Sequence, residues 1–203
     1  MRPLILCIVA LPAAADPLPE IPFQTLVLDP SHASITATVD HLGFSRYTLS
    51  FDSFDARLDF GTDRPEDTRL EARIDVTSLD LPAPPDGFVD TMLGADWFAA
   101  ATHPQITFVS DSITIMGDDS ARVAGTMTML GQSAPVALDV TFNGGYADAP
   151  WEPYARIGFS ATGALDRSAF GMTNGIPAPG SPLGVGDTVT FAIEAEFIGA
   201  PAN

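Results

Sequence analysis

Apolar and polar residues alternate along most of this chain with a period of two, which is typical of β-strands. In the segment that begins at Ile35, Ala37 and Val39 share a face with Ile35, while threonines occupy the other face. The same pattern recurs in the segments 47–51, 56–60, 70–76, 105–109, 112–116, 122–129, 136–142, 157–165 and 188–197. The alternation therefore predicts about ten strands arranged as an antiparallel meander.

Turn chemistry separates several of these segments. We expect turns at Gly131-Gln132, at Asn143-Gly144-Gly145 and at Gly117-Asp118-Asp119. The stretch 171–186 (GMTNGIPAPGSPLGVG) is rich in glycine and proline, so it predicts a flexible loop that serves as a lid or a rim.

One segment departs from the period of two. Between Pro85 and Pro104, apolar residues recur at four-residue spacing, at Val89, Leu93 and Trp97 and again at Phe88 and Met92. This stripe predicts a short amphipathic helix, with Asp86 as its N-cap. An all-β meander with one helix closes either as a sandwich or as a barrel, and the periodicity does not distinguish the two.

The N-terminus has the pattern of a cleavable signal peptide over residues 1–15. Met1-Arg2 is a short positive start, residues 3–12 are an apolar run, and Ala13-Ala14-Ala15 is a small-residue cleavage site. Cys7, the one cysteine, lies inside this segment in a context that does not favour a lipid anchor. We therefore expect a periplasmic protein, exported as a single domain of residues 16–203 without disulfides.

Charge limits the partners of the chain. Its 203 residues contain 26 acidic and 9 basic residues, a formal net charge of -17, and every basic residue is arginine. Such a chain offers no basic stripe for a phosphate backbone, so nucleic acid is excluded as a partner. Neutral or cationic partners are expected.

Catalytic and metal-binding motifs are missing from the sequence. There is no G-x-S-x-G nucleophile elbow and no phosphate-binding glycine loop. The three histidines, His32, His41 and His103, have no evident carboxylate or thiolate partner at ligand spacing. We therefore predict no catalytic residues, no metal site and no cofactor.

Short motifs along the chain resemble the YceI-like family of secreted lipid-binding barrels. They occur in the family's order, as Asp29-Pro30-Ser31-His32, His41-Leu42-Gly43, Ser78-Leu79-Asp80, Asp90 with Leu93, Asp96-Trp97-Phe98, His103-Pro104, residues 106–108, residues 123–128, Gly131, Pro135-Val136, residues 166–171 and Val185-Gly186-Asp187. The resemblance implies an all-β fold, an extended antiparallel lipocalin-like β-barrel with one short helix packed at an end. It also implies an apolar interior that holds a polyisoprenoid lipid such as a quinone.

The residues expected to meet that ligand follow from the resemblance and from the strand pattern. They are His41, Phe44, Trp97, Phe98, Phe108, Asp166, Arg167, Phe170 and Met172. Several have a structural alternative: Asp166 and Arg167 either orient a polar head or form an ion pair, and the aromatic residues either line the cavity or pack in the core. The small inward residues Ala37, Ala56, Ala72 and Gly125 favour an open lumen. A neutral head group fits better than a diphosphate, which needs several convergent cations.

Two functions remain open at this point. The preferred one is a periplasmic carrier for a polyisoprenoid lipid with a quinone-like head. The alternative is a secreted, non-enzymatic interaction module with a filled barrel, which acts through its acidic surface on a cationic or membrane-bound redox partner. A homodimer is compatible with either. The two functions differ in one observable, because only the carrier needs a long internal cavity.

Overall fold

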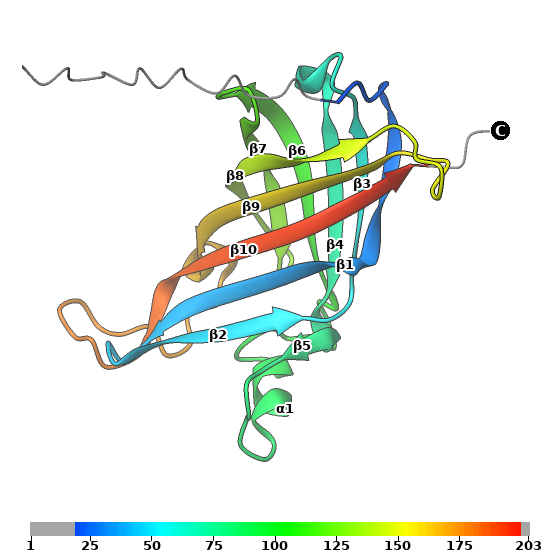
Figure 1. Cartoon of the computed structure of the whole chain (residues 1–203). Coiled ribbons are helices and arrows are strands. Elements are labelled where there is room, and N and C mark those ends of the chain that lie inside the picture. The colour runs from blue at the N-terminus through cyan, green and yellow to red at the C-terminus, as the bar shows by residue number, and fades with distance from the viewer. Residues whose placement is uncertain (1–18, 200–203) are drawn as a thin grey trace, which may run out of the picture.

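The computed structural model describes residues 19–199 and places ten strands, one α-helix and three short 3-10 turns in that range (Figure 1). The strands are β1 (Gln24–His41), β2 (Ser45–Phe51), β3 (Phe54–Phe60), β4 (Arg69–Asp75), β5 (Leu79–Asp80), β6 (Gln105–Ile115), β7 (Ser120–Met129), β8 (Gln132–Tyr146), β9 (Arg156–Asp166) and β10 (Val185–Gly199), and the helix is α1 (Phe88–Leu93). The predicted signal peptide lies outside the described residues.

Eight of the strands form a closed antiparallel barrel. The order is β10-β9-β8-β7-β6-β4-β3-β1, and β1 pairs with β10 to close the ring. Closure leaves no unpaired edge in the ring, which removes the usual route to edge-to-edge aggregation. The barrel was implied by the family resemblance and is confirmed.

Strand β1 is long and changes partner along its length. Its first residues pair with β3, from Gln24 opposite Phe60 to Val27 opposite Arg57. Its second half, from Thr36 onward, pairs with β2. The register with β10 shifts between Leu28 and Ala33, so a bulge separates the two halves. This bulge lets one strand serve both the closed ring and the extension made by β2 and β5, which Figure 1 shows reaching toward α1.

The inward faces of the strands match the alternation in the sequence. Phe54, Ala56, Leu58 and Phe60 of β3, for example, all line the lumen. Toward the start of β1 the interior is packed by four phenylalanines whose ring centroids lie 5.4–6.2 Å from a neighbouring ring, namely Phe60, Phe142, Phe159 and Phe197. Such tilted and edge-on aromatic contacts stabilise a core beyond their area burial. A second apolar cluster, which includes Phe51, Met92 and Phe98, surrounds α1.

Several local predictions were wrong. The segments 105–109 and 112–116 form one strand, β6, with a bulge between Ser110 and Ser112. The glycines expected in a turn at 143–145 lie inside β8, where the register shifts between Phe142 and Gly144.

The helix is shorter than its stripe suggests. It ends at Leu93, so Trp97 lies in the turns that follow it. Its N-cap is Gly87 in a left-handed conformation, without a side-chain cap, and not Asp86. Within residues 19–199, no helix is long and apolar enough to span a membrane.

Candidate functional site: an apolar cavity in the barrel

A cavity of about 680 Å³ occupies the barrel interior. It extends from the end formed by the β1–β2 turn and the 171–184 loop, where His41 and Val185 line it, to the β6–β7 turn at residues 116–119. Its wall consists mainly of aliphatic and aromatic side chains from all eight ring strands, such as Val39, Leu70, Ile113, Val123, Leu138, Leu165 and Ile193. A volume of this size lies within the range of roughly 300–1,000 Å³ found for ligand sites.

Small residues keep the lumen open. Ala37, Ala56 and Ala72 line the cavity, as the sequence predicted. Gly125 also faces inward, but the ring of Phe108 covers it: a Cβ built on Gly125 would lie 2.4 Å from Cζ of Phe108. The ring can therefore lie flat against the barrel wall.

The same arrangement recurs on β9, at a glycine that the sequence analysis did not single out. A Cβ on Gly163 would lie 2.4 Å from Cζ of Phe191, which lines the cavity. The sequence signal is an inward-facing glycine on one strand beside an inward-facing phenylalanine on the next, and the strand register places Gly163 opposite Phe191.

Arg167 is the most deeply buried charged side chain in the described structure, with 3% of its surface exposed. Its guanidinium donates hydrogen bonds to four backbone carbonyls, those of Met172 (3.1 Å), Asn174 (2.8 Å), Val185 (2.8 Å) and Gly186 (2.8 Å). All four belong to the loop between β9 and β10 or to its junction with β10. Arg167 therefore ties both ends of this loop to the barrel.

Burial lowers the pKa of Arg167 from its usual value, and the charge of Asp187 opposes this shift. Asp166, by contrast, faces away and accepts a hydrogen bond from Thr188 (2.6 Å). No ion pair joins Asp166 and Arg167 in the described structure, so the structural alternative of an Asp166–Arg167 pair is wrong. Backbone carbonyls compensate this cation instead.

Of the nine residues expected at the site, His41, Trp97, Phe98, Phe108, Arg167 and Met172 line the cavity. The other three lie elsewhere. Phe44 is at the tip of the β1–β2 turn, with 80% of its surface exposed, and Phe170 is fully buried in the core beside the cavity. Asp166 is on the outer surface. Alternation alone does not settle these positions, because all three lie at or beyond strand ends.

The polar residues of the lining are few and are concentrated at the ends. His41 and Tyr47 lie at the loop end, with ring centroids 6.4 Å apart. Asp118, Asp119 and Ser120 lie at the opposite end. Asp55 and Arg73 also border the cavity, and they are directly opposite one another on β3 and β4.

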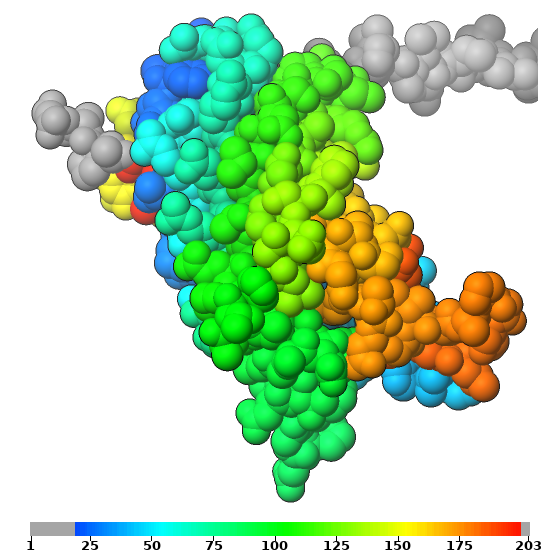
Figure 2. All heavy atoms as spheres, turned by 180° about the vertical axis from the view of Figure 1, so that it is seen from behind, coloured from blue at the N-terminus to red at the C-terminus, as the bar shows by residue number. Residues whose placement is uncertain are grey.

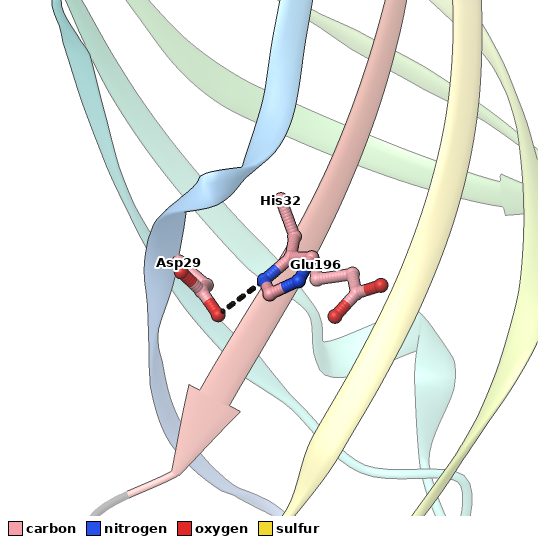
Figure 3. A group of neighbouring side chains, drawn as sticks. All are labelled: Asp29, His32 and Glu196. Carbon is pink, nitrogen blue, oxygen red and sulfur yellow. Dashed lines mark hydrogen bonds and ion pairs between the residues drawn. The ribbon is translucent and has the colours of Figure 1, made fainter.

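A cluster of polar side chains lies on the outside of the barrel, at the bulge of β1 (Figure 3). Asp29, His32 and Glu196 place their ligand atoms within 4.8 Å of one another, and Nδ1 of His32 is 2.9 Å from Asp29. His32 therefore has a carboxylate partner, and the prediction that it has none was wrong. The spacing of three residues from Asp29 to His32 was visible, but only the bulge brings the two side chains together.

Arg156 occupies the centre of this cluster. Its Nη1 donates to Asp29 (2.8 Å) and to Glu196 (2.7 Å), while Nε and Nη2 form a bidentate pair with Glu152 (2.8 and 2.7 Å). Tyr146 also donates to Glu152. Hydrogen bonds from Arg156 and Tyr146 lower the pKa of Glu152 to about 2, and hydrogen bonds from Ser31 and Arg156 hold the pKa of Asp29 well below its usual value.

This network has the character of a structural clamp. The guanidinium already contacts the two carboxylates that a metal ion would need, and it connects the β1 bulge to β10 and to the segment before β9. A bidentate arginine pair is among the stronger ionic contacts in proteins. Arg156 thus contacts all three carboxylates of the cluster.

Comparison with known proteins places this architecture in a family. Residues 26–197 match the YceI-like domain, and the chain belongs to the YceI-like family. The chain is 30% identical over 151 residues to a UPF0312 protein of Pseudomonas savastanoi pv. phaseolicola, which covers 74% of this chain and 75% of that protein. It is 33% identical over 142 residues to a UPF0312 protein of Pseudomonas putida, with 70% and 71% covered.

Solved structures share the fold. BcnA of Burkholderia cenocepacia superposes with a TM-score of 0.70 at 26% identity, over 83% of this chain and 98% of that one. A polyisoprenoid binding domain from Saccharophagus degradans superposes with a TM-score of 0.61 at 13% identity, over 88% and 99% of the two chains. These solved structures share the barrel architecture of this chain.

Proposed function

We propose that the protein is a periplasmic carrier of a polyisoprenoid lipid with a neutral, quinone-like head. The single observation that carries this proposal is the cavity of about 680 Å³, which extends along the barrel and is lined mainly by apolar side chains. The interaction-module alternative needs a barrel that is filled by its own side chains, whereas this barrel contains a cavity. The structural neighbour described as a polyisoprenoid binding domain supports the choice of ligand class.

Apolar burial alone accounts for useful affinity. Each buried CH₂ group contributes about 0.8 kcal/mol, so a five-carbon isoprene unit contributes roughly 3 to 4 kcal/mol. Four sheathed units then offset an association cost of about 4 to 15 kcal/mol. Shape and apolarity therefore suffice for the tail, and polar contacts are needed only for the head.

The charges around the cavity favour a neutral head. Arg167 uses four of its five N–H donors on backbone carbonyls, which leaves little for a phosphate. Arg73 lies opposite Asp55. The negative charge of Asp55 offsets the positive charge of Arg73 and weakens its attraction for a phosphate. His41 and Tyr47 at the loop end can each donate a hydrogen bond to a carbonyl oxygen, which is what a quinone presents.

A binding role also fits the chemistry of the lining better than catalysis. Within the described residues, the serine and the histidine that border the cavity, Ser120 and His41, lie at opposite ends of the barrel. A serine nucleophile needs its base within hydrogen-bond reach.

The periplasmic location rests on the signal-peptide pattern of residues 1–15. A membrane-bound redox partner is a natural source or recipient of a quinone.

Native mass spectrometry of the protein purified from the periplasm, followed by organic extraction, tests this function. We expect a stoichiometric prenyl lipid that carries a quinone. Added ubiquinone should refill the delipidated protein, and a prenyl diphosphate of equal length should compete only at higher concentration. An empty protein that also refuses ubiquinone would contradict the carrier function, and efficient competition by the diphosphate would contradict the neutral head.

A further inference from the structure

Two loops at one end of the cavity form an exposed apolar projection, which we call the lip: residues 41–46 of the β1–β2 turn and residues 171–186 between β9 and β10. Figure 2 shows the 171–184 loop protruding from the body of the molecule, beside the blue surface of the β1–β2 turn. Within the lip, Phe44 is 80% exposed and Leu183 is 66% exposed. Exposed apolar side chains that gather in one patch mark an interaction site, whereas singly scattered ones do not.

The two halves of the lip are held together. The Leu42 N–H donates to the Gly184 carbonyl (2.8 Å), and a Cβ built on Gly43 would lie 3.2 Å from that of Pro182. The Val185 N–H donates to the Gly175 carbonyl (2.7 Å), and Arg167 fixes the base of the loop. Phe44 and Leu183 are therefore presented by an ordered platform, so burying them costs less conformational entropy than burying a mobile loop.

The lip also differs in charge from the rest of the molecule. Arg46 is the one charged residue within residues 41–46 and 171–186. The acidic residues next to these ranges are Asp187 and Asp40, and Asp40 accepts a hydrogen bond from the Gly43 N–H (2.9 Å). The opposite end of the barrel is strongly acidic, with Asp118 and Asp119 in the β6–β7 turn. The negative charges of lipid phosphates repel the acidic end of the barrel but do not repel the uncharged side chains of the lip.

The lip is continuous with the cavity. His41 and Val185 belong to the lip and line the cavity, and so does Met172. Any surface that covers the tip of the lip is therefore brought next to the loop end of the lumen.

From these observations we infer that the lip docks the protein on a phospholipid bilayer, with Phe44 and Leu183 inserted at the level of the head groups. Aromatic and aliphatic side chains are favoured at this depth. A bilayer is also the place where a polyisoprenoid resides, so docking there would let the lipid pass between membrane and cavity without crossing water. The purpose of the docking rests on the proposed carrier function, but the docking itself is measured without any isoprenoid.

Co-sedimentation with vesicles of phosphatidylethanolamine and phosphatidylcholine tests the inference. The wild-type protein should bind them, and the double variant Phe44→Ser/Leu183→Ser should lower the partition coefficient by about tenfold or more, since each side chain loses its apolar burial. Both positions are exposed, so circular dichroism should show an unchanged fold.

The chain offers a closely matched control. Trp151 (79% exposed) and Met116 (67% exposed) are nearly as exposed as the two lip residues, but they lie one and two residues from an acidic residue and away from the lip. Trp151→Ser/Met116→Ser should retain vesicle binding. An equal loss in both double variants, or no binding by the wild type, would overturn the inference. A dimer that the lip variant abolishes, without any vesicle binding, would also overturn it and assign the lip to self-association.

A direct probe of depth completes the test. Trp151→Ser leaves Trp97 as the one tryptophan, so this variant gives the background signal. Phe44→Trp added to it should show stronger fluorescence quenching by vesicles with brominated acyl chains than Trp151→Ser alone, and no increase in quenching would contradict insertion. If the wild type binds ubiquinone but no vesicles, the lip inference fails and the carrier function stands. If it binds vesicles but no isoprenoid, the carrier function fails and the lip inference stands.

Discussion

The guanidinium of Arg167 lies over the indole ring of Trp97, with the guanidinium carbon 5.5 Å from the ring centroid. Trp97 comes from the turns after α1, whereas Arg167 comes from the end of β9. The contact therefore joins the turns after α1 to the base of the 171–186 loop of the lip. Together with its four carbonyl partners, this contact makes Arg167 the residue that connects the segment after α1 with both ends of the 171–186 loop.

Replacement of Arg167 by lysine should destabilise the protein by about 2–4 kcal/mol. An ammonium keeps the charge, but it cannot reach four carbonyls in a planar fork, and the abandoned carbonyls remain buried. Urea denaturation measures the loss. Arg122→Lys is the matched control, because Arg122 pairs with Asp139 on the surface and should change stability little. Equal effects of the two substitutions would contradict the central role of Arg167.

The environment of Arg167 shows where sequence reasoning ends. The strand faces were predictable because apolar inward residues alternate with polar outward ones in β3, in β4 and in β1 from Ile35 to Val39. A shift of one residue in any of these strands would expose its apolar set to water. The partners of Arg167 were not predictable, since every residue carries a backbone carbonyl. Only the folded path of the loop determines which carbonyls converge on the guanidinium.

Two other predictions, the turn at 143–145 and the start of β1, were wrong because the pairing of strands in the folded barrel overrides the local sequence pattern. Asn143-Gly144-Gly145 has turn chemistry, but β8 must continue to Tyr146 to stay paired with β9, so the glycines form a bulge instead. Residues 24–34, more than half of β1, were missed because the bulge interrupts the alternation just where Asp29 turns toward Arg156.

Substitution of Gly163 by alanine should force the ring of Phe191 into the cavity. The new Cβ would lie 2.4 Å from Cζ of Phe191 and 2.9 Å from the carbonyl oxygen of Ala137. Such overpacking costs about 1–3 kcal/mol, and the displaced ring should also weaken ubiquinone binding. Thermal denaturation and ligand titration measure the two effects.

Gly158 of the same strand provides the control for this prediction. The nearest atoms to a Cβ at Gly158 are 3.8 Å and 4.0 Å away, so alanine fits there without displacement. Gly158→Ala should leave both stability and ligand binding near the wild-type values. If Gly163→Ala behaved the same way, the flat packing of Phe191 against the wall would be irrelevant to the width of the cavity.

The Arg156 network predicts a specific acid sensitivity. The pKa values of Asp29 and Glu152 are lowered in the folded protein, so their stabilising effect is complete above the unfolded values of 3.8 and 4.5 and is lost as the pH falls toward about 2. Arg156→Gln should lower the free energy of unfolding at pH 7 and flatten its dependence on pH between about 4.5 and 2. Chemical denaturation across this range measures the slope. Arg122→Gln, which removes an exposed pair, should leave the slope unchanged, and a flattened slope in that control would assign the effect to overall charge.

Ala72 offers a test of whether the ligand occupies the middle of the barrel. It lies opposite Ala56 across β3 and β4, and both side chains line the cavity. Ala72→Phe should fill the lumen at this level and reduce the affinity for a long-chain ubiquinone by about tenfold or more, because several buried CH₂ groups lose their place. Its neighbour Glu71 is exposed on the outer face of the same strand, so Glu71→Phe introduces the same side chain without narrowing the lumen. Isothermal titration with long-chain and short-chain quinones should show a loss for Ala72→Phe that grows with tail length and no such dependence for Glu71→Phe. A loss independent of tail length would mean that the tail does not pass Ala72, and the ligand would then have to be confined to one end of the barrel.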